Sequence, residues 1–269
     1  MHSRLPTYFI SHGGGPWPFM PEKLSGTYRE LAAFLAGLPR QIGVTPKALL
    51  VISGHWEETD FAVMAHPQPP MLYDYYGFPP HTYQVQYPAP GAPALAARVG
   101  TLIAAAGLAT RQDQRRGFDH GTFTPLSVMY PQADVPVVQL SLRADFDPAA
   151  HIALGRALAP LRDEGVLIIG SGLSYHNLRA MSAAGREPSR RFDDWLGVAL
   201  GADPQERGSH LLRWEAAPAA RLAHPREEHL LPLMVAVGAA FDEPCERVHH
   251  QDDFMGAISV SSFRFGTVA

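Results

Sequence analysis

Three apolar runs each end in a small-residue turn that carries a histidine, and this repeated plan constrains the fold more than any other feature of the sequence. The runs Leu5–Ser11, Ala48–Ser53 and Gly165–Gly170 are continuous in apolar, aromatic and β-branched residues, which is typical of buried strands. The histidines that follow the three runs are His12, His55 and His176. We therefore expect a sheet that delivers sequence-distant histidines to one of its edges.

Helical patterns separate these strands, so strand and helix alternate along the chain. We predict helices at Tyr28–Leu38, Ala94–Ala106, Pro148–Leu161, Phe192–Leu200 and Glu228–Phe241, and a further strand at Ile258–Phe265. Such alternation predicts an α/β fold whose largely buried central sheet has much parallel character and is flanked by helices on both faces. In such sheets ligands bind outside the carboxyl ends of the strands, which is where we expect a metal site.

One domain spanning residues 1–269 is the expected organisation. The sequence has no internal repeat and no interdomain linker, and 46% hydrophobic residues are enough for a large core. The segment Pro67–Pro93 is rich in proline and aromatic residues and has no helical period. We predict that it forms an ordered loop or lid over the crevice, with a strand only at Thr82–Tyr87.

Charge and cysteine content exclude several classes of protein. The 22 basic and 26 acidic residues give a net charge of −4, which offers no basic surface for nucleic acid. One cysteine, Cys245, excludes an intrachain disulfide and a cysteine-rich zinc or iron–sulfur site. The N-terminus lacks the apolar stretch of a signal peptide, and no apolar run is long enough to span a bilayer. We expect a cytoplasmic protein that binds neither nucleic acid nor membrane.

Thirteen histidines favour metal or proton chemistry. A single histidine after a strand is usually a capping or core imidazole, but three at equivalent points favour a site assembled by the fold. Further along, Pro225 suits the first turn of a helix, which places His229 in the early turns, facing inward, and His224 outside as a cap or a donor. Glu227 and Glu228 fit solvated first-turn acids, although either is also a possible ligand.

The remaining polar residues allow two interpretations each. His120 either orients the substrate or a metal-bound oxygen, or pairs with Asp119 in a turn. Basic residues near it either bind a substrate carboxylate or form a solvated loop, which the sequence favours; they are Arg111, Arg115 and Arg116. Gly13–Gly15 lacks the residues of a nucleotide fingerprint and indicates close backbone approach. Solvated or structural histidines are expected at His2, His66, His151, His210, His249 and His250.

Taken together, these motifs resemble the DODA-type extradiol aromatic ring-opening dioxygenases, the class III, LigB-like family that includes the catalytic subunits of protocatechuate 4,5-dioxygenase. The resemblance spans nearly the whole chain. It rests on residues 11–16 (SHGGGP), 53–57 (SGHWE), 72–79 (LYDYYGFP), 87–91 (YPAPG), 119–121 (DHG), 170–178 (GSGLSYHNL), 224–225 (HP) and 228–229 (EH). The implied fold is an α/β domain with its metal at the strand ends.

The resemblance also implies roles for individual residues. His12, His55 and His229 correspond to metal ligands, and His176 corresponds to the catalytic acid/base, although it is also placed to be a ligand. His120 is expected to assist catalysis, and the substrate is expected to contact Tyr76, Phe78 and His224. The wider class holds Fe(II) with two histidines and a glutamate, whereas this chain has His229 at the third position. Because an all-imidazole site also suits zinc, both Fe(II) and Zn(II) fit.

The activity implied is cleavage of a catechol, DOPA-like or otherwise substituted, beside its two hydroxyl groups with O2. A small aromatic diol and O2 are therefore the expected partners. Two alternatives use the same residues. A zinc hydrolase would activate water at the metal with Glu57 or His176 as its base, and a non-enzymatic relative would keep the fold without turnover. Nothing in the sequence indicates the oligomeric state.

Overall fold

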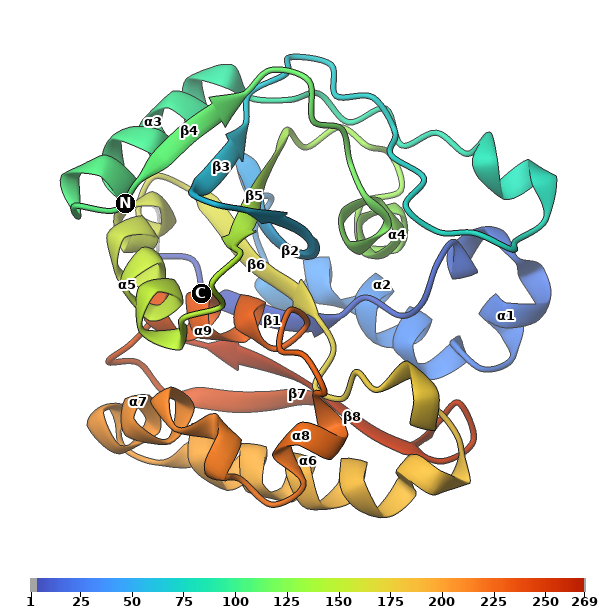
Figure 1. Ribbon diagram of the computed structural model, residues 1–269. Coiled ribbons are helices and arrows are strands. Elements are labelled where there is room, and N and C mark those ends of the chain that lie inside the picture. Colours follow the sequence, from blue (N-terminus) through green and yellow to red (C-terminus); the bar gives the residue numbers. More distant parts are fainter. Residues whose placement is uncertain (1–3, 269) are drawn as a thin grey trace.

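A mixed sheet of eight strands forms the centre of the described part of the chain, residues 4–268, in the computed structural model (Figure 1). In chain order the strands are β1 (Thr7–Ser11), β2 (Ala48–Glu58), β3 (Phe61–Met64), β4 (Thr110–Asp113), β5 (Val137–Arg143), β6 (Val166–Gly172), β7 (Cys245–Phe254) and β8 (Ile258–Phe265). Across the sheet they follow the order β4-β3-β5-β2-β6-β1-β8-β7.

The three strands predicted to precede histidines are neighbours at the centre of this sheet. β6 lies between β1 and β2 and runs parallel to both, with Ile169 opposite Tyr8 on one side and Val51 on the other. β5 continues the parallel part next to β2, whereas β8 joins β1 in antiparallel fashion. The parallel centre therefore brings the carboxyl ends of β1, β2 and β6 to one edge, as the sequence predicted.

Helices cover both faces of the sheet, which confirms the predicted α/β architecture. They are α1 (Pro21–Ser25), α2 (Arg29–Ile42), α3 (Pro93–Ala105), α4 (His120–Met129), α5 (Pro148–Leu158), α6 (Arg186–Gly201), α7 (Pro204–Leu212), α8 (Ala220–Ala223) and α9 (Leu231–Ala239). Figure 1 shows α3 and α5 on one side of the sheet, α2 and α4 on the other, and α6 to α8 beside β7 and β8. Helix α9 packs against α5 and the central strands.

Local sequence explains where these helices begin and end. In α2 the buried residues Leu31, Leu35 and Leu38 recur every three or four positions, so one face of the helix meets the core. The helix ends at Gly43, whose φ of 77° is the left-handed conformation that glycine adopts readily. At the site, Asp119 caps α4 by accepting a hydrogen bond from the backbone N–H of Thr122.

Two local predictions are wrong. The segment Thr82–Tyr87 is not a strand but a 3-10 turn over Pro80–Tyr83 followed by irregular chain. Its carbonyl groups accept hydrogen bonds from tyrosine hydroxyls of the same loop, so they do not pair with a strand. The last predicted helix, Glu228–Phe241, begins only at Leu231, with Pro232 and not Pro225 in its first turn. Two prolines suited the helix start, and the second one occupies it.

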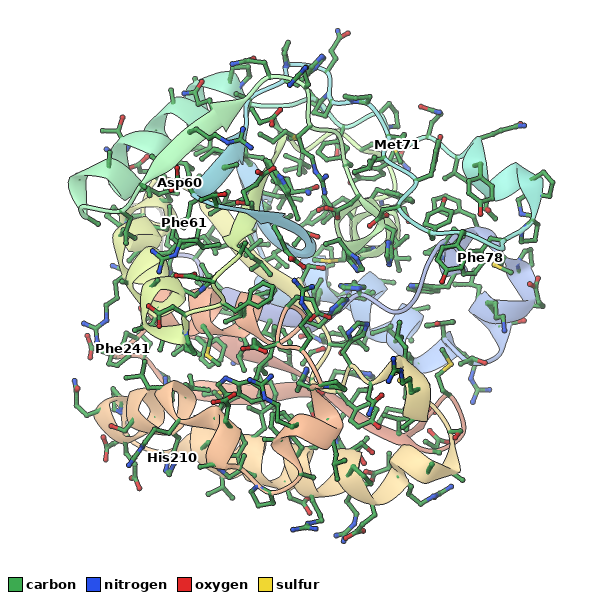
Figure 2. All side chains as sticks on the ribbon, in the orientation of Figure 1. Asp60, Phe61, Met71, Phe78, His210 and Phe241 are labelled. Atoms are coloured by element: carbon green, nitrogen blue, oxygen red, sulfur yellow. The ribbon has the colours of Figure 1, made fainter. Side chains whose placement is uncertain are left out.

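The predicted lid is an ordered loop held to the body by a few hydrogen bonds. Met71 forms a bridge with Phe118, and Gly91 forms another with Val137. Figure 2 shows Phe78 beside the part of the chain that carries α1, away from Met71. Among residues 4–268, no helix combines the length and apolar character needed to cross a lipid bilayer. His2 lies outside the described residues.

Candidate metal centre and cavity

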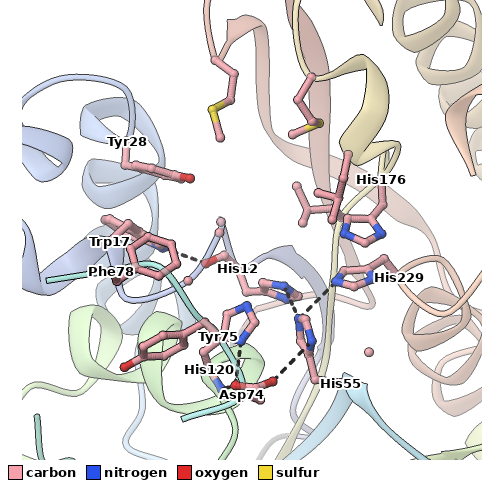
Figure 3. Close-up of a pocket in the computed structure, with 18 of the residues that line it drawn as sticks. His12, Trp17, Tyr28, His55, Asp74, Tyr75, Phe78, His120, His176 and His229 are labelled. Atoms are coloured by element: carbon pink, nitrogen blue, oxygen red, sulfur yellow. Dashed lines mark hydrogen bonds and ion pairs between the residues drawn. The ribbon is translucent and has the colours of Figure 1, made fainter. Parts of the chain in front are cut away.

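Five histidines from different elements converge at the carboxyl edge of the sheet (Figure 3). His12 directly follows β1, His55 lies within β2 and His176 follows β6, while His120 is the first residue of α4 and His229 precedes α9. Gly172 allows this assembly, because a Cβ atom there would lie 2.1 Å from the carbonyl oxygen of His229. Close backbone approach, which the sequence suggested for Gly13–Gly15, is thus found at Gly172, while Gly13 and Gly15 lie against the side chains of Trp17 and Phe78.

The ring nitrogens of three of these histidines point at one another. The Nε2 atom of His55 lies 3.1 Å from Nε2 of His12 and 3.1 Å from Nε2 of His229. His12, His55 and His120 also offer nitrogen atoms that all lie within 4.8 Å of one another, as do His176, Glu228 and His229 with their ligand atoms. The geometry thus brings together every predicted ligand, and it offers His120 as another neighbour of His12 and His55.

The opposite ring nitrogen, Nδ1, of His12, His55 and His229 has an oxygen partner in each case. Nδ1 of His12 lies 3.1 Å from the hydroxyl oxygen of Ser171, whose own proton goes to the carbonyl of Gly121. Nδ1 of His55 lies 3.4 Å from Oδ2 of Asp74, and Nδ1 of His229 lies 2.9 Å from Oε1 of Glu228. Because the oxygens of Ser171 and Glu228 act as acceptors, Nδ1 of His12 and of His229 carries the proton and Nε2 keeps its lone pair. The longer contact of His55 with the Asp74 carboxylate favours the same tautomer.

Burial keeps these three rings neutral. Burial, reinforced by the neighbouring imidazoles, lowers the pKa of His12 and of His229 well below the usual histidine range. The same causes lower the pKa of His55 to about 3, although Asp74 acts in the opposite direction. A neutral imidazole is the form that binds metal ions. Neutral Nε2 lone pairs only 3.1 Å apart, as between His55 and each of the other two rings, repel unless a cation lies between them.

The other two histidines are held by the same carboxylates. Nδ1 of His120 lies 2.8 Å from Oδ1 of Asp74, which also accepts a hydrogen bond of 3.0 Å from the backbone N–H of His120. Nδ1 of His176 lies 2.9 Å from Oε1 of Glu228. Burial raises the pKa of Asp74, but the hydrogen bond from His120 outweighs it and brings the pKa to about 2. Asp74 is therefore a carboxylate at neutral pH.

A cavity of about 750 Å³ opens onto the histidine cluster and is lined by all five of these imidazoles. The lid supplies Asp74, Tyr75, Tyr76 and Phe78 to its wall. Tyr76 is 92% exposed and lies at the mouth, whereas Phe78 packs against the glycine turn after β1. Two residues expected to contact the substrate, Tyr76 and Phe78, thus line the cavity.

His224 does not, and the expectation that it contacts the substrate needs correction. Its side chain has no solvent exposure and does not line the cavity. Nε2 of His224 donates a 2.9 Å hydrogen bond to the carbonyl of Ser174, and the ring packs edge-on against Phe192 and Trp214. His224 therefore supports the turn that carries His176 and does not face the space where a substrate would bind.

Several charged residues near the site are engaged with protein partners. Arg116 donates to Oδ2 of Asp119 at 2.9 Å and to the carbonyl of His55 at 3.2 Å, so it holds the β2 end and is not a solvated loop residue. Both carboxylate oxygens of Glu57 accept hydrogen bonds from Arg226, at 2.7 and 2.5 Å. Arg226 and Glu57 also line the cavity.

The histidines expected to be structural or solvated lie apart from the cluster. His151 is buried in α5 and receives the backbone N–H of Arg143. His249 and His250, which were expected outside regular structure, lie in strand β7, because this edge strand is too polar to be recognised by its pattern. Nε2 of His81 in the lid lies 3.1 Å from the carbonyl of Phe19, away from the cluster.

Sequence reasoning missed Asp74 and Ser171 and left Glu228 undecided. Each lies beside the Nδ1 atom of a clustered histidine. Asp74 stands in an aromatic loop without periodicity, so only the loop's path across the site reveals its contacts. The Gly170-Ser171-Gly172 motif contained a signal for Ser171, since two glycines frame a single polar side chain at the strand end.

Fold and site together define a class of protein: an α/β protein with a histidine-based, metal-compatible centre at the carboxyl edge of its sheet. Residues 5–264 match the family described as the catalytic LigB subunit of aromatic ring-opening dioxygenase. A protein of Beta vulgaris named 4,5-DOPA dioxygenase extradiol is 40% identical over 96% of this chain and 96% of its own length. A protein of Escherichia coli with the same name is 34% identical over 98% of this chain and 96% of its own length.

A third relative, named dioxygenase tasH, from Hapsidospora irregularis, is 36% identical over 97% of this chain and 85% of its own length. A crystal structure of an uncharacterized protein from Escherichia coli K12 superposes with a TM-score of 0.78 at 31% identity, covering 98% of this chain and all of that one. The chain belongs to the LigB family of aromatic ring-opening dioxygenases. It is therefore an oxidoreductase of a metal-dependent family that acts on aromatic substrates with O2.

Proposed function

We propose that this protein is a ferrous-iron-dependent extradiol dioxygenase that opens the ring of a substituted catechol, for which DOPA is the first candidate. One observation carries the proposal: Nε2 of His55 lies 3.1 Å from Nε2 of both His12 and His229, while an oxygen lies beside the Nδ1 atom of each of the three rings. The names of the relatives support the chemistry and suggest DOPA.

The residues present fit a divalent metal ion. His12, His55 and His229 would hold it through Nε2, because Nε2 of His12 and Nε2 of His229 each lie 3.1 Å from Nε2 of His55. This ligand set carries no charge. The carboxylates of Asp74 and Glu228 contact the Nδ1 atoms of His55 and His229 and so place negative charge next to two of the ligands. Imidazoles bind both Fe(II) and Zn(II), so the reaction and not the ligand set favours iron.

Bound ferrous iron would supply the redox chemistry with O2 and would acidify the catechol hydroxyls as a Lewis acid. The chain's own residues then have to manage two protons. His176 lines the cavity and its Nδ1 is fixed by Glu228, so we assign it the role of base, with Nε2 taking a hydroxyl proton. His120 is oriented by Asp74 and is assigned to hold the developing negative charge on a substrate oxygen.

In the overall reaction, the ring bond that breaks joins one hydroxyl-bearing carbon to the neighbouring carbon without a hydroxyl group. Both atoms of O2 enter the product. The product is a muconic semialdehyde with a conjugated chain. The lid has two tasks in this scheme. Phe78 and Tyr75 offer aromatic faces to the substrate ring, and the loop that carries them limits the access of water.

The structure weakens the zinc hydrolase as an alternative. That mechanism was to use Glu57 or His176 as base, but both oxygens of Glu57 accept hydrogen bonds from Arg226. Both oxygens of Glu57 are thus directed at the guanidinium group of Arg226 and not at the histidine cluster. His176 then remains the base for either chemistry, and the metal and the use of oxygen distinguish the two.

Oxygen uptake tests the proposal. Metal-free protein is reconstituted anaerobically with Fe(II) or Zn(II) and mixed with DOPA, protocatechuate, gallate and catechol, with His176→Ala as a parallel sample. We expect uptake and a yellow product with Fe(II) alone, and a decrease in rate of about 10²- to 10⁴-fold in His176→Ala. No uptake with any catechol at full iron content would contradict the proposal, and ester and amide hydrolysis by the zinc form would then be measured.

A further inference from the structure

We propose that Asp74 is a positioning residue through which the lid fixes the orientation of two site histidines, His55 and His120. The inference deepens the proposed function, because it assumes that His55 binds the metal and that His120 faces the substrate. Asp74 is carried by the lid, between Met71 and Phe78; the residue as a whole is exposed, but its side chain keeps only 19% of its solvent exposure. Figure 3 shows its carboxylate between the two imidazoles.

The two oxygens of Asp74 serve different rings. Oδ1 accepts from Nδ1 of His120 at 2.8 Å and from the backbone N–H of His120 at 3.0 Å. Oδ2 lies 3.4 Å from Nδ1 of His55. An ionised carboxylate only accepts hydrogen bonds, so Nδ1 of His120 donates to it, and the longer contact of 3.4 Å favours a proton on Nδ1 of His55 as well. Nε2 of His55 is then the unprotonated nitrogen, which is the tautomer that binds a metal ion.

The lid holds Asp74 in place by contacts on both sides of it. Before it, the backbone N–H of Leu72 donates to the carbonyl of Phe118 at 2.8 Å. After it, the hydroxyl of Tyr75 donates to the carbonyl of Thr82 at 2.6 Å. A displacement of the loop would therefore withdraw the carboxylate from both rings. The position of the lid and the state of the metal ligand are linked through one side chain.

A second carboxylate serves as an internal comparison. Glu228 contacts Nδ1 of His229 and Nδ1 of His176, each at 2.9 Å, so it also joins one expected ligand to one expected catalytic histidine. Glu228 lies on the segment that leads into α9, in the body of the protein. Of these two carboxylates only Asp74 belongs to the lid. A displacement of the lid therefore moves Asp74 away from its histidines and leaves Glu228 in place.

The substitution Asp74→Asn tests the inference with almost no change of shape. The amide oxygen can still accept both hydrogen bonds from His120, but the amide nitrogen then faces Nδ1 of His55. Two donors oppose each other, so His55 is driven to the tautomer with a protonated Nε2. Titration of the metal-free proteins with Zn(II) and with Co(II) should show 10- to 100-fold weaker binding in Asp74→Asn and a changed visible spectrum of the Co(II) form.

Tyr73→Phe is the matched control. It removes another hydrogen bond of the same loop, from the Tyr73 hydroxyl to the carbonyl of Val85, but touches no histidine. We expect its metal affinity to equal that of the wild type. Hydrogen exchange over residues 72–83 gives the second readout. Zn(II) should slow exchange there in the wild type and in Tyr73→Phe, and it should have a much smaller effect in Asp74→Asn.

The tautomers can be read in the wild-type protein without any variant. Long-range ¹H–¹⁵N spectra of the metal-free protein should show protonated Nδ1 in both His55 and His120, and a protonated Nε2 with bare Nδ1 in either ring overturns the inference. Equal metal affinity in Asp74→Asn and wild type overturns the positioning role while the proposed function stands. A wild-type protein that binds neither Zn(II) nor Co(II) overturns both.

Discussion

The imidazole rings of His176 and His229 stack with their centroids 3.4 Å apart and an angle of 20° between their planes. Oε1 of Glu228 lies 2.9 Å from Nδ1 of each ring, so one carboxylate oxygen orients both. Asp74 contacts Nδ1 of His55 and of His120 in a similar way, with a separate carboxylate oxygen for each ring. The centre is thus built from two similar units, each joining an expected metal ligand to an expected catalytic histidine through a carboxylate.

The first prediction separates ligands from catalytic residues. His229→Ala should lose bound metal, with an affinity for Zn(II) at least 100-fold below that of the wild type, because one of three imidazole donors is missing. His120→Ala should retain full metal content and lose turnover, because His120 is assigned to the substrate. Metal analysis after dialysis against a defined free Zn(II) concentration decides between them. Loss of metal in His120→Ala with retention in His229→Ala would exchange the two roles.

A second prediction concerns Glu228. Glu228→Gln keeps the size of the side chain, and its amide oxygen can still accept from both Nδ1 atoms. The substitution removes the negative charge behind His176 and His229 and places an amide donor at the buried position of Oε2, which has no hydrogen-bond partner. We expect the metal affinity to fall by about 10-fold or more. We also expect kcat to fall further in Glu228→Gln than it does in Tyr73→Phe. Circular dichroism checks that the variant is folded. Unchanged affinity and kcat would show that the shared carboxylate has no functional effect.

The contact between the lid and the glycine turn gives a third prediction. Gly15 has a φ of +56°, and a Cβ atom there would lie 2.5 Å from the ring of Phe78. Gly15→Ala should therefore cost about 1–3 kcal/mol of stability and displace Phe78, which raises KM several-fold with little change in metal content. Gly77→Ala is the control, since Gly77 also has a positive φ, +76°, but nothing within 4 Å of the added Cβ. If both variants have the same KM, the contact does not shape the cavity.

Much of this site could be predicted from sequence, and the reason is local. His12 and His55 follow or end continuous apolar runs, and such runs become parallel central strands whose carboxyl ends meet. Asp74 could not be predicted in the same way, because its loop has no period and its contacts depend on where the loop crosses the site. The resemblance led to a substrate role for His224, but the pattern alone does not reveal that its ring is buried against Phe192 and Trp214.

The edges of the sheet were also beyond the reach of sequence patterns. Strand β7 is mostly polar because it is an edge strand exposed on one side, and β3 and β4 have only four residues each. Helix α4 was missed because Gly121 and Pro125 lie within it, although Asp119 supplies its N-terminal cap. Burial gives the central strands a strong pattern, whereas these elements depend on tertiary contacts that no local pattern records.

The last prediction follows from the corrected role of His224. Burial lowers the pKa of this fully buried histidine to about 3, against an ordinary value of 6.5. Below pH 6.5 the unfolded chain takes up a proton at this position that the folded protein does not. The contribution of His224 is therefore fully present above pH 6.5 and is lost as the pH falls toward 3, by about 1.4 kcal/mol per pH unit where the difference reaches one proton.

His224→Gln removes this proton while the amide can still donate to the carbonyl of Ser174. Urea unfolding of the metal-free proteins at pH 6.5, 5.5 and 4.5 should then show a free energy of unfolding that falls less steeply with decreasing pH in the variant, by about 1.4 kcal/mol per unit. All other titrating groups are common to both proteins and cancel in the comparison. KM should stay at the wild-type value, because His224 does not line the cavity. Parallel curves for the two proteins would show that folding does not lower the pKa of His224, and a raised KM in the variant would restore His224 to the list of functional residues.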